Sequence, residues 1–144
     1  MPKTIIVGYR VSDLDRSREF YRALGYDEIG TVPFDDGSQL VVLKFPEEEA
    51  ASIELVHRPA DGPVEVGGFD HLAITVDDLA ETVERLTAAG LEPGPLQLLD
   101  GEDGLKISWL TDPDGYRIEL VQWPAGHTDG LTAADFAQPD NPSA

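Results

Sequence analysis

The sequence repeats itself at a fixed spacing of 65 residues. The tetrapeptide Ile-Glu-Leu-Val occurs at positions 53–56 and again at 118–121, so Glu54 and Glu119 occupy matching places. The same offset separates Val11-Ser-Asp-Leu14 from Val76-Asp-Asp-Leu79, and Gly25 from Gly90. One spacing shared by a strand, a helix start and a helix end indicates a duplicated structural unit.

Each half predicts the order strand–helix–strand–strand–strand. In the first half, residues 4–11 alternate as a strand does, a helix runs from an N-cap at Ser12-Asp13 to Gly25, and Asp35-Asp-Gly37 predicts a hairpin. Strand 52–58 closes that half. The second half predicts a strand over 69–76, a helix over 79–89, a Pro-interrupted edge strand at best over 91–98, a strand over 105–111, and a last strand after the turn Asp112-Pro-Asp-Gly115.

These elements predict an α+β fold in which two βαβββ modules form a half-open, eight-stranded cup. The expected boundaries are 1–60 for the first module, 61–68 for a Pro- and Gly-rich linker, 69–123 for the second module and 124–144 for a loosely held tail with a short helix at 131–136. Three hairpin-linked strands cannot close a barrel alone, so the two modules are expected to share one cavity.

The composition excludes several classes of partner. The chain has 144 residues with a net charge of −18, which argues against binding to nucleic acid or to an anionic membrane surface. It contains no cysteine, so disulfides and thiolate ligands are excluded. No segment has the length of a membrane span and the first residues do not resemble a signal peptide, so we expect a cytoplasmic protein.

The repeat also predicts a metal site. His71 maps back onto Ile6, and pseudo-twofold packing of the halves would bring together positions 6, 54, 71 and 119. Glu54, His71 and Glu119 form a donor set suited to Zn²⁺, Ni²⁺, Mn²⁺ or Fe²⁺, whereas Ile6 cannot bind a metal. The simpler interpretation is that His71 is a hydrogen-bonded core residue and that both carboxylates face solvent.

Other side chains have the parity to face the same cavity. Arg10 and Arg58 share strand faces with positions 6 and 54, so either could hold a substrate carboxylate. Equally, both arginines could form ion pairs with the two carboxylates in the absence of any metal. Trp109, with Phe69 and Trp123, could form an apolar wall, although aromatic residues more often belong to a core.

The motifs together resemble those of the vicinal oxygen chelate superfamily, and within it the glyoxalase I branch (glyoxalase/bleomycin-resistance/dioxygenase proteins). The resemblance covers about residues 5–123 and depends on the segments 10–21, Ile53-Glu-Leu55, Gly68-Phe-Asp-His71 and Asp112-Pro-Asp-Gly-Tyr-Arg-Ile-Glu119. It implies that Glu54, His71 and Glu119 are three of four metal ligands. The fourth, usually His or Gln, is replaced by Ile6.

The resemblance implies a lyase or isomerase that converts a small carbonyl compound, such as the thiohemiacetal of a low-molecular-weight thiol, through an enediolate. Glu119 is then the expected base, Glu54 a ligand and second proton shuttle, and Arg10 matches an arginine that holds the glutathione carboxylate. A homodimer is expected, sometimes with each site shared across chains. Two alternatives stay open: a metal-free, bleomycin-resistance-like protein that binds a small molecule, and an acyl-CoA epimerase.

Overall fold

The computed structural model describes residues 1–137 and confirms the α+β fold. The first module contains the elements β1 (Val7–Arg10), α1 (Leu14–Leu24), β2 (Asp27–Pro33), β3 (Gln39–Lys44) and β4 (Ile53–His57), followed by a 3₁₀ turn, η1 (Pro59–Asp61). The second contains β5 (His71–Thr75), α2 (Leu79–Ala88), β6 (Gln97–Leu98), β7 (Lys106–Thr111) and β8 (Arg117–Gln122). The strand expected over 91–98 is therefore reduced to two residues.

The two modules have the same sheet topology. Each forms a four-stranded mixed sheet, in the orders β1-β4-β3-β2 and β5-β8-β7-β6, with its first and last strands parallel. Gly8 lies beside Glu54 in the first sheet, and Ala73 lies beside Glu119 in the second. The repeat in the sequence thus corresponds to a repeat in register, and the eight strands form two open sheets.

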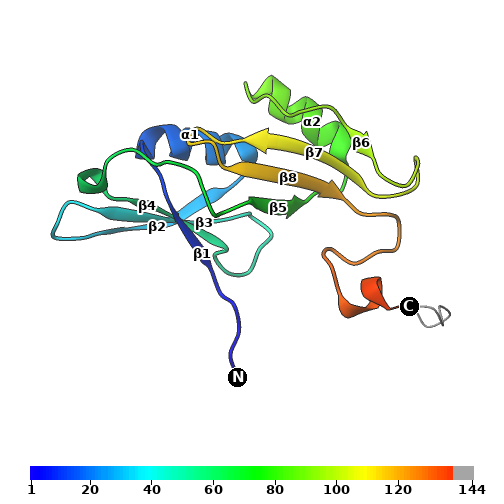
Figure 1. Ribbon diagram of the computed structural model, residues 1–144, viewed down its shortest axis with the longest axis horizontal. Coiled ribbons are helices and arrows are strands. Elements are labelled where there is room, and N and C mark those ends of the chain that lie inside the picture. The colour runs from blue at the N-terminus through cyan, green and yellow to red at the C-terminus, as the bar shows by residue number, and fades with distance from the viewer. Residues whose placement is uncertain (138–144) are drawn as a thin grey trace.

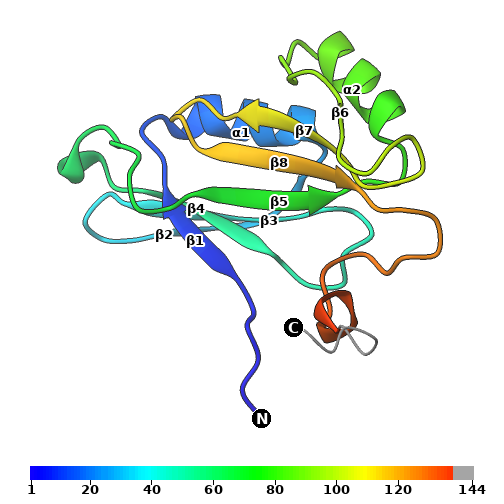
Figure 2. The same cartoon turned by 45° about the vertical axis from the view of Figure 1, so that its right-hand side comes forward.

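Both helices begin where the repeat predicts. Asp13 and Asp78 accept hydrogen bonds from backbone N–H groups in the first turn of α1 and α2, and Gly25 takes the positive φ that ends α1. The helices lie on one side of the molecule, whereas both ends of the described chain leave on the other side (Figures 1 and 2). The apolar residues on the helix side of both sheets form one continuous core. Each sheet therefore has one buried face and one face that no helix covers, here called its open face.

A buried hydrogen-bond chain joins the modules. The Tyr9 hydroxyl donates to the Tyr21 hydroxyl (2.6 Å), which donates to Asp112 Oδ2 (2.8 Å) in the turn before β8. Tyr116 in the same turn donates to the Arg10 carbonyl (2.8 Å), and the Asp114 carboxylate accepts from the Ser12 N–H. The turn that the sequence predicts is thus also the clamp between the second module and the start of α1.

The tail folds back towards the open side of the second sheet, which its composition did not predict. Asp129 accepts a hydrogen bond from Thr75 (3.4 Å), and the predicted short helix is a 3₁₀ turn, η2 (Ala133–Phe136). The remaining residues of the predicted tail, 138–144, lie outside the described part of the chain.

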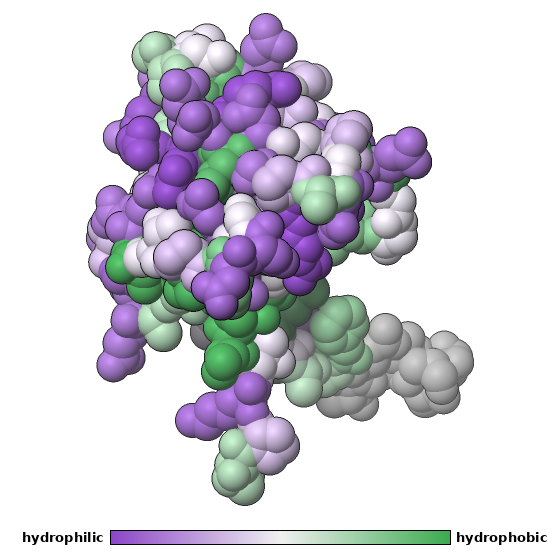
Figure 3. All heavy atoms as spheres, turned by 90° about the vertical axis from the view of Figure 1, so that its left-hand side faces the viewer, coloured by the Kyte–Doolittle hydropathy of each residue, from purple (hydrophilic) through white to green (hydrophobic). Residues whose placement is uncertain are grey.

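Polar residues dominate the face of the molecule that contains the β2–β3 hairpin end, and hydrophobic residues gather next to the N-terminal segment (Figure 3). Neither α1 nor α2 is long and apolar enough to cross a membrane, and residues 1–137 contain no other helix that could.

Candidate metal half-sites on the open faces

His71 and Glu119 lie together on the open face of the second sheet. His71 Nε2 is 3.8 Å from Glu119 Oε1, and both side chains are partly exposed. The other ring nitrogen, Nδ1, is 2.6 Å from the Asp70 carboxylate. An imidazole that donates from Nδ1 to a carboxylate directs its Nε2 lone pair outward, which is the usual arrangement of a metal-bound histidine. Two ligand atoms that each lie about 2.1 Å from a tetrahedral ion are about 3.4 Å apart. His71 Nε2 and Glu119 Oε1, at 3.8 Å, would therefore need to move only slightly to bind one ion.

Glu54 lies on the open face of the first sheet, where a glycine makes room for it. A Cβ at Gly8 would be 2.9 Å from Glu54 Oε1 and 3.0 Å from its Cγ, so the carboxylate lies across the position that a side chain on β1 would fill. A glycine within a strand often marks such a close approach. Ile6 directly precedes β1 and carries no donor.

A single chain does not bring the three predicted ligands together. Within residues 1–137, no group of three or more His, Asp or Glu side chains is arranged to hold a metal ion. We expected the two halves of one chain to direct Glu54, His71 and Glu119 at one point. Within one chain this expectation is wrong. The physical reason is that the modules pack through their helix sides, by way of Tyr9, Tyr21 and Asp112, and leave the open faces unpaired.

The two predicted substrate arginines differ in what they contact. Arg10 donates to the Gly62 carbonyl (2.9 Å) and lies 4.0 Å from Asp61, so the linker holds its guanidinium. Arg58 is exposed at the end of β4. In the described chain neither arginine forms an ion pair with Glu54 or Glu119. The alternative in which the two arginines neutralise these carboxylates without a metal is therefore not found within one chain.

Arg117 is a candidate that the sequence analysis missed. It pairs with His71 across the sheet, and its guanidinium carbon is 4.5 Å from the centre of the Trp109 ring, which also makes an edge contact with His71 at 5.2 Å. The signal was available, because residues two apart on one strand share a face and Arg117 is two before Glu119. Trp109 therefore lies on the predicted face, next to the guanidinium of Arg117. Phe69 instead packs in the core against Tyr9.

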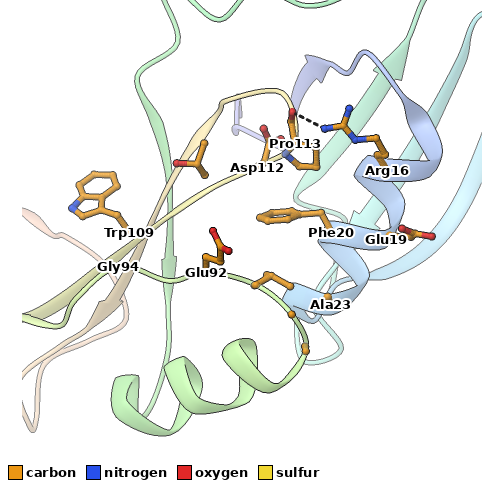
Figure 4. Close-up of a pocket in the computed structure, with 13 residues that line it drawn as sticks. Arg16, Glu19, Phe20, Ala23, Glu92, Gly94, Trp109, Asp112 and Pro113 are labelled. Carbon is orange, nitrogen blue, oxygen red and sulfur yellow. Dashed lines mark hydrogen bonds between the residues drawn. The ribbon is translucent and has the colours of Figure 1, made fainter.

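A hollow of about 710 Å³ lies between α1, the segment after α2 and β7. Phe20 and Glu92 point into it, Arg16 contacts the Pro113 carbonyl at its rim, and the Trp109 indole points away from it (Figure 4). None of the candidate metal ligands lines this hollow.

The comparisons with known proteins agree with the fold. Residues 5–120 match the model of the Glyoxalase/Bleomycin resistance protein/Dioxygenase superfamily. The chain belongs to this superfamily. It is 36% identical over 121 residues to a lactoylglutathione lyase of Escherichia coli O157:H7, which covers 78% of this chain and 87% of that protein. The glyoxalase I of Leishmania major has a similar structure, with a TM-score of 0.68 and 28% identity over 85% of this chain and 87% of that one.

Some relatives are much longer than this chain. A probable chloroplastic lactoylglutathione lyase of Arabidopsis thaliana is 36% identical over 126 residues, which are 81% of this chain but only 34% of that protein. Membership of the superfamily covers lyases, dioxygenases and antibiotic-binding proteins alike. The reaction must therefore be argued from the side chains themselves.

Proposed function

We propose that the chain is a glyoxalase I-like, metal-dependent lyase or isomerase that acts on the thiohemiacetal of a small carbonyl compound. The observation that carries this proposal is the His71–Glu119 pair, with Nε2 turned to the carboxylate and Nδ1 held by Asp70. Similarity to proteins named lactoylglutathione lyase supports the same class of substrate.

The metal site of this proposal is shared between two copies of the chain in a homodimer. One copy supplies His71 and Glu119 from its second sheet, and the other supplies Glu54 from its first sheet. Both half-sites lie on open faces, and a twofold axis that joins unlike open faces forms two equal sites at once. Ile6 leaves one position without a protein ligand, which suits a site that must accept water or substrate oxygens.

A divalent ion held by these three residues supplies Lewis-acid stabilisation of the negative charge on the substrate's vicinal oxygens. Glu119, at the edge of the site, takes the C–H proton and returns it to the neighbouring carbon, so the substrate is isomerised with no net change in protons. Arg117, beside Trp109, holds a carboxylate of the thiol part. Asp70 keeps the ring of His71 in the tautomer that leaves Nε2 free.

The proposal is tested by metal content and turnover in one preparation. The purified protein should take up about one Ni²⁺, Zn²⁺ or Mn²⁺ per chain and should isomerise the hemithioacetal of methylglyoxal and glutathione. Glu119→Gln should lower kcat by at least about 10³-fold, since it removes the base, while the circular dichroism spectrum is unchanged. A protein that binds none of these ions would contradict the proposal.

Ile6 favours a second candidate function, a metal-free protein that binds a small cationic molecule, because Ile6 cannot bind a metal. The net charge of −18 on the chain would attract such a ligand. Saturable binding of a basic drug such as bleomycin that is unaffected by EDTA, together with absence of turnover, would identify this function instead. Among residues 1–137, no feature favours the acyl-CoA epimerase over these two functions.

A further inference from the structure

The strand β6 forms one edge of the second sheet, beyond β7 (Figure 1), and its backbone is paired on one side only. The Leu99 N–H donates to the Leu105 carbonyl (3.0 Å), so Gln97 and Leu99 direct their backbone groups to β7. Because the residues bonded to a neighbouring strand alternate along an antiparallel pair, Leu96 and Leu98 direct theirs away from the sheet. Within residues 1–137, no group bonds to the backbone N–H or carbonyl of Leu96 or Leu98. This edge therefore leaves two donors and two acceptors open.

The edge is also apolar and exposed. Leu96, Leu98 and Leu99 are 41%, 44% and 52% exposed. Leu96 and Leu98 are two apart, so their side chains share one face of the strand. An exposed apolar strand edge is a ready template for pairing with another extended chain. Pro95 has no N–H, so the edge ends there and accepts only a short segment.

The corresponding edge strand of the first sheet is interrupted. β2 is exposed along its whole length, but its register shifts between Glu28 and Gly30 and it ends at Pro33. A β-bulge and a proline both hinder the addition of a strand at a sheet edge. The features that protect β2 therefore do not occur within the run Leu96–Leu99.

The charge around β6 favours a basic partner. The loop after β6 carries Asp100, Glu102 and Asp103, which are all exposed, and none of them forms an ion pair with another described residue. Lys106 lies opposite Leu98 in β7, and the whole chain has a net charge of −18. A second copy of this acidic edge is repelled, whereas a basic segment is attracted.

We propose that β6 binds a short, extended segment of a partner protein, in which basic and apolar residues alternate, as an antiparallel fifth strand of the second sheet. Backbone hydrogen bonds to Leu96 and Leu98 supply affinity, and side-chain contacts supply specificity. Residues that exchange hydrogen bonds across an antiparallel pair share a face, so the apolar residues of the segment bond to β6 and cover Leu96 and Leu98. Its basic residues then lie on the face of Leu99, next to the acidic loop.

This contact is separate from the candidate metal half-site. His71 and Glu119 lie on β5 and β8, and β5 is the opposite edge of the same sheet. Binding at β6 therefore requires neither metal nor turnover.

The probe is the peptide acetyl-Lys-Val-Lys-Val-Lys-amide, titrated into full-length protein labelled with ¹⁵N. The amide signals of Leu96 and Leu98 should shift saturably and their hydrogen exchange should slow, because both N–H groups gain acceptors. The peptide acetyl-Glu-Val-Glu-Val-Glu-amide has the same apolar residues and should bind at least about tenfold more weakly, since its charges are repelled.

N-methylation of the basic peptide tests the backbone hydrogen bonds. Methyl groups on the two valine nitrogens should abolish binding, because these N–H groups face β6. The matched control carries methyl groups on the nitrogens of the second and third lysines, which face away from β6, and should retain binding.

Two matched variants locate the contact. Leu98 and Val32 are each 44% exposed and each lie on an edge strand. Leu98→Lys should weaken the basic peptide at least about tenfold, because it places a cation in the middle of the edge, whereas Val32→Lys should leave binding unchanged.

Equal effects of the two variants, or of the two methylation patterns, would overturn the inference, and so would equal binding of the basic and acidic peptides. If the peptide does not bind and Leu98→Lys abolishes self-association of the protein, the edge belongs to a second copy and the inference is wrong. Metal uptake by Leu98→Lys should equal that of the unaltered protein, so failure of the proposed function is detected separately.

Discussion

Tyr21 holds the two modules together through its hydroxyl, so Tyr21→Phe is the most informative stability variant. The side chain is fully buried, accepts a hydrogen bond from Tyr9 and donates one to Asp112. Removal of one oxygen atom leaves the Tyr9 hydroxyl without an acceptor and Asp112 Oδ2 without a donor. The aromatic ring and its packing stay in place.

The expected loss follows from these two orphaned groups. A hydrogen bond to a charged group contributes about 1.5–3 kcal/mol, and an unsatisfied buried hydroxyl costs about 1–3 kcal/mol. We therefore expect the free energy of unfolding at pH 7 to fall by about 3–4 kcal/mol, which is a large fraction of the roughly 5–15 kcal/mol of an ordinary domain. At about 3 °C per kcal/mol for a chain of this size, Tm falls by about 10 °C.

The loss should depend on pH in a defined direction. Burial raises the pKa of Asp112 above its ordinary value, although the hydrogen bond from Tyr21 opposes that shift. The folded state thus holds this proton more tightly than the unfolded chain, so stability decreases as pH rises through the folded pKa. Tyr21→Phe removes the opposing hydrogen bond and raises that pKa further. The penalty should be smaller near pH 4 than at pH 7.

Urea unfolding followed by circular dichroism at pH 4 and pH 7 measures both effects. Tyr26→Phe is the matched control, because Tyr26 is also buried in the first module, with 5% of its surface exposed, but its hydroxyl makes no hydrogen bond within residues 1–137. It should cost less than about 0.5 kcal/mol. Equal losses for the two variants, or a Tyr21→Phe loss that does not change with pH, would refute the reasoning.

Three further predictions concern the half-site of the first sheet and the tail. Gly8→Ala should weaken metal binding with little loss of stability, because its Cβ displaces the flexible Glu54 carboxylate. Ile6→His should tighten metal binding about tenfold or more by adding a fourth donor. The pKa of His127 is raised by its hydrogen bond to Asp135, whose own pKa is lowered by the Thr132 N–H and by His127. Tail docking should thus be firmest between about pH 4 and pH 6.5. It should weaken at higher pH as His127 loses its proton, and at lower pH as Asp135 gains one.

Each of these has a neighbouring control. Gly30→Ala lies in the same cross-strand row as Gly8 but meets no atom within 4 Å, so it should leave metal binding unchanged. Ile5→His places the imidazole at an exposed neighbouring position and should not tighten metal binding. Trp123 fluorescence in a Trp109→Phe background reports tail docking, and a flat pH profile would contradict the role given to His127.

The sequence predicted the modules well because the signals for them are local. The N-caps Asp13 and Asp78, the hairpin at Asp35–Gly37 and the repeated Ile-Glu-Leu-Val each depend on a few neighbouring residues, and each lies where the pattern indicates. The proximity of His71 to Glu119 also follows, since the two residues lie on neighbouring strands of one module and share a face.

What the sequence could not predict depends on contacts between distant segments. The separation of Glu54 from His71 follows from how the modules pack, and no spacing within one module encodes that packing. The role of Gly8 needs the parallel register with Glu54, 46 positions along the chain. The docking of the tail has no periodic signal, because it depends on a few polar contacts and one stacked pair of rings.

A mixed dimer tests the shared metal site most directly. Glu54→Gln alone and His71→Ala alone each damage both sites of a dimer, and each should bind no metal tightly. If the two variants are co-expressed with different tags and the mixed dimer is isolated, one site regains Glu54 from one chain and His71 with Glu119 from the other. The account predicts one tightly bound ion per mixed dimer by metal analysis. A mixed dimer as empty as its parents would contradict a site shared between two chains.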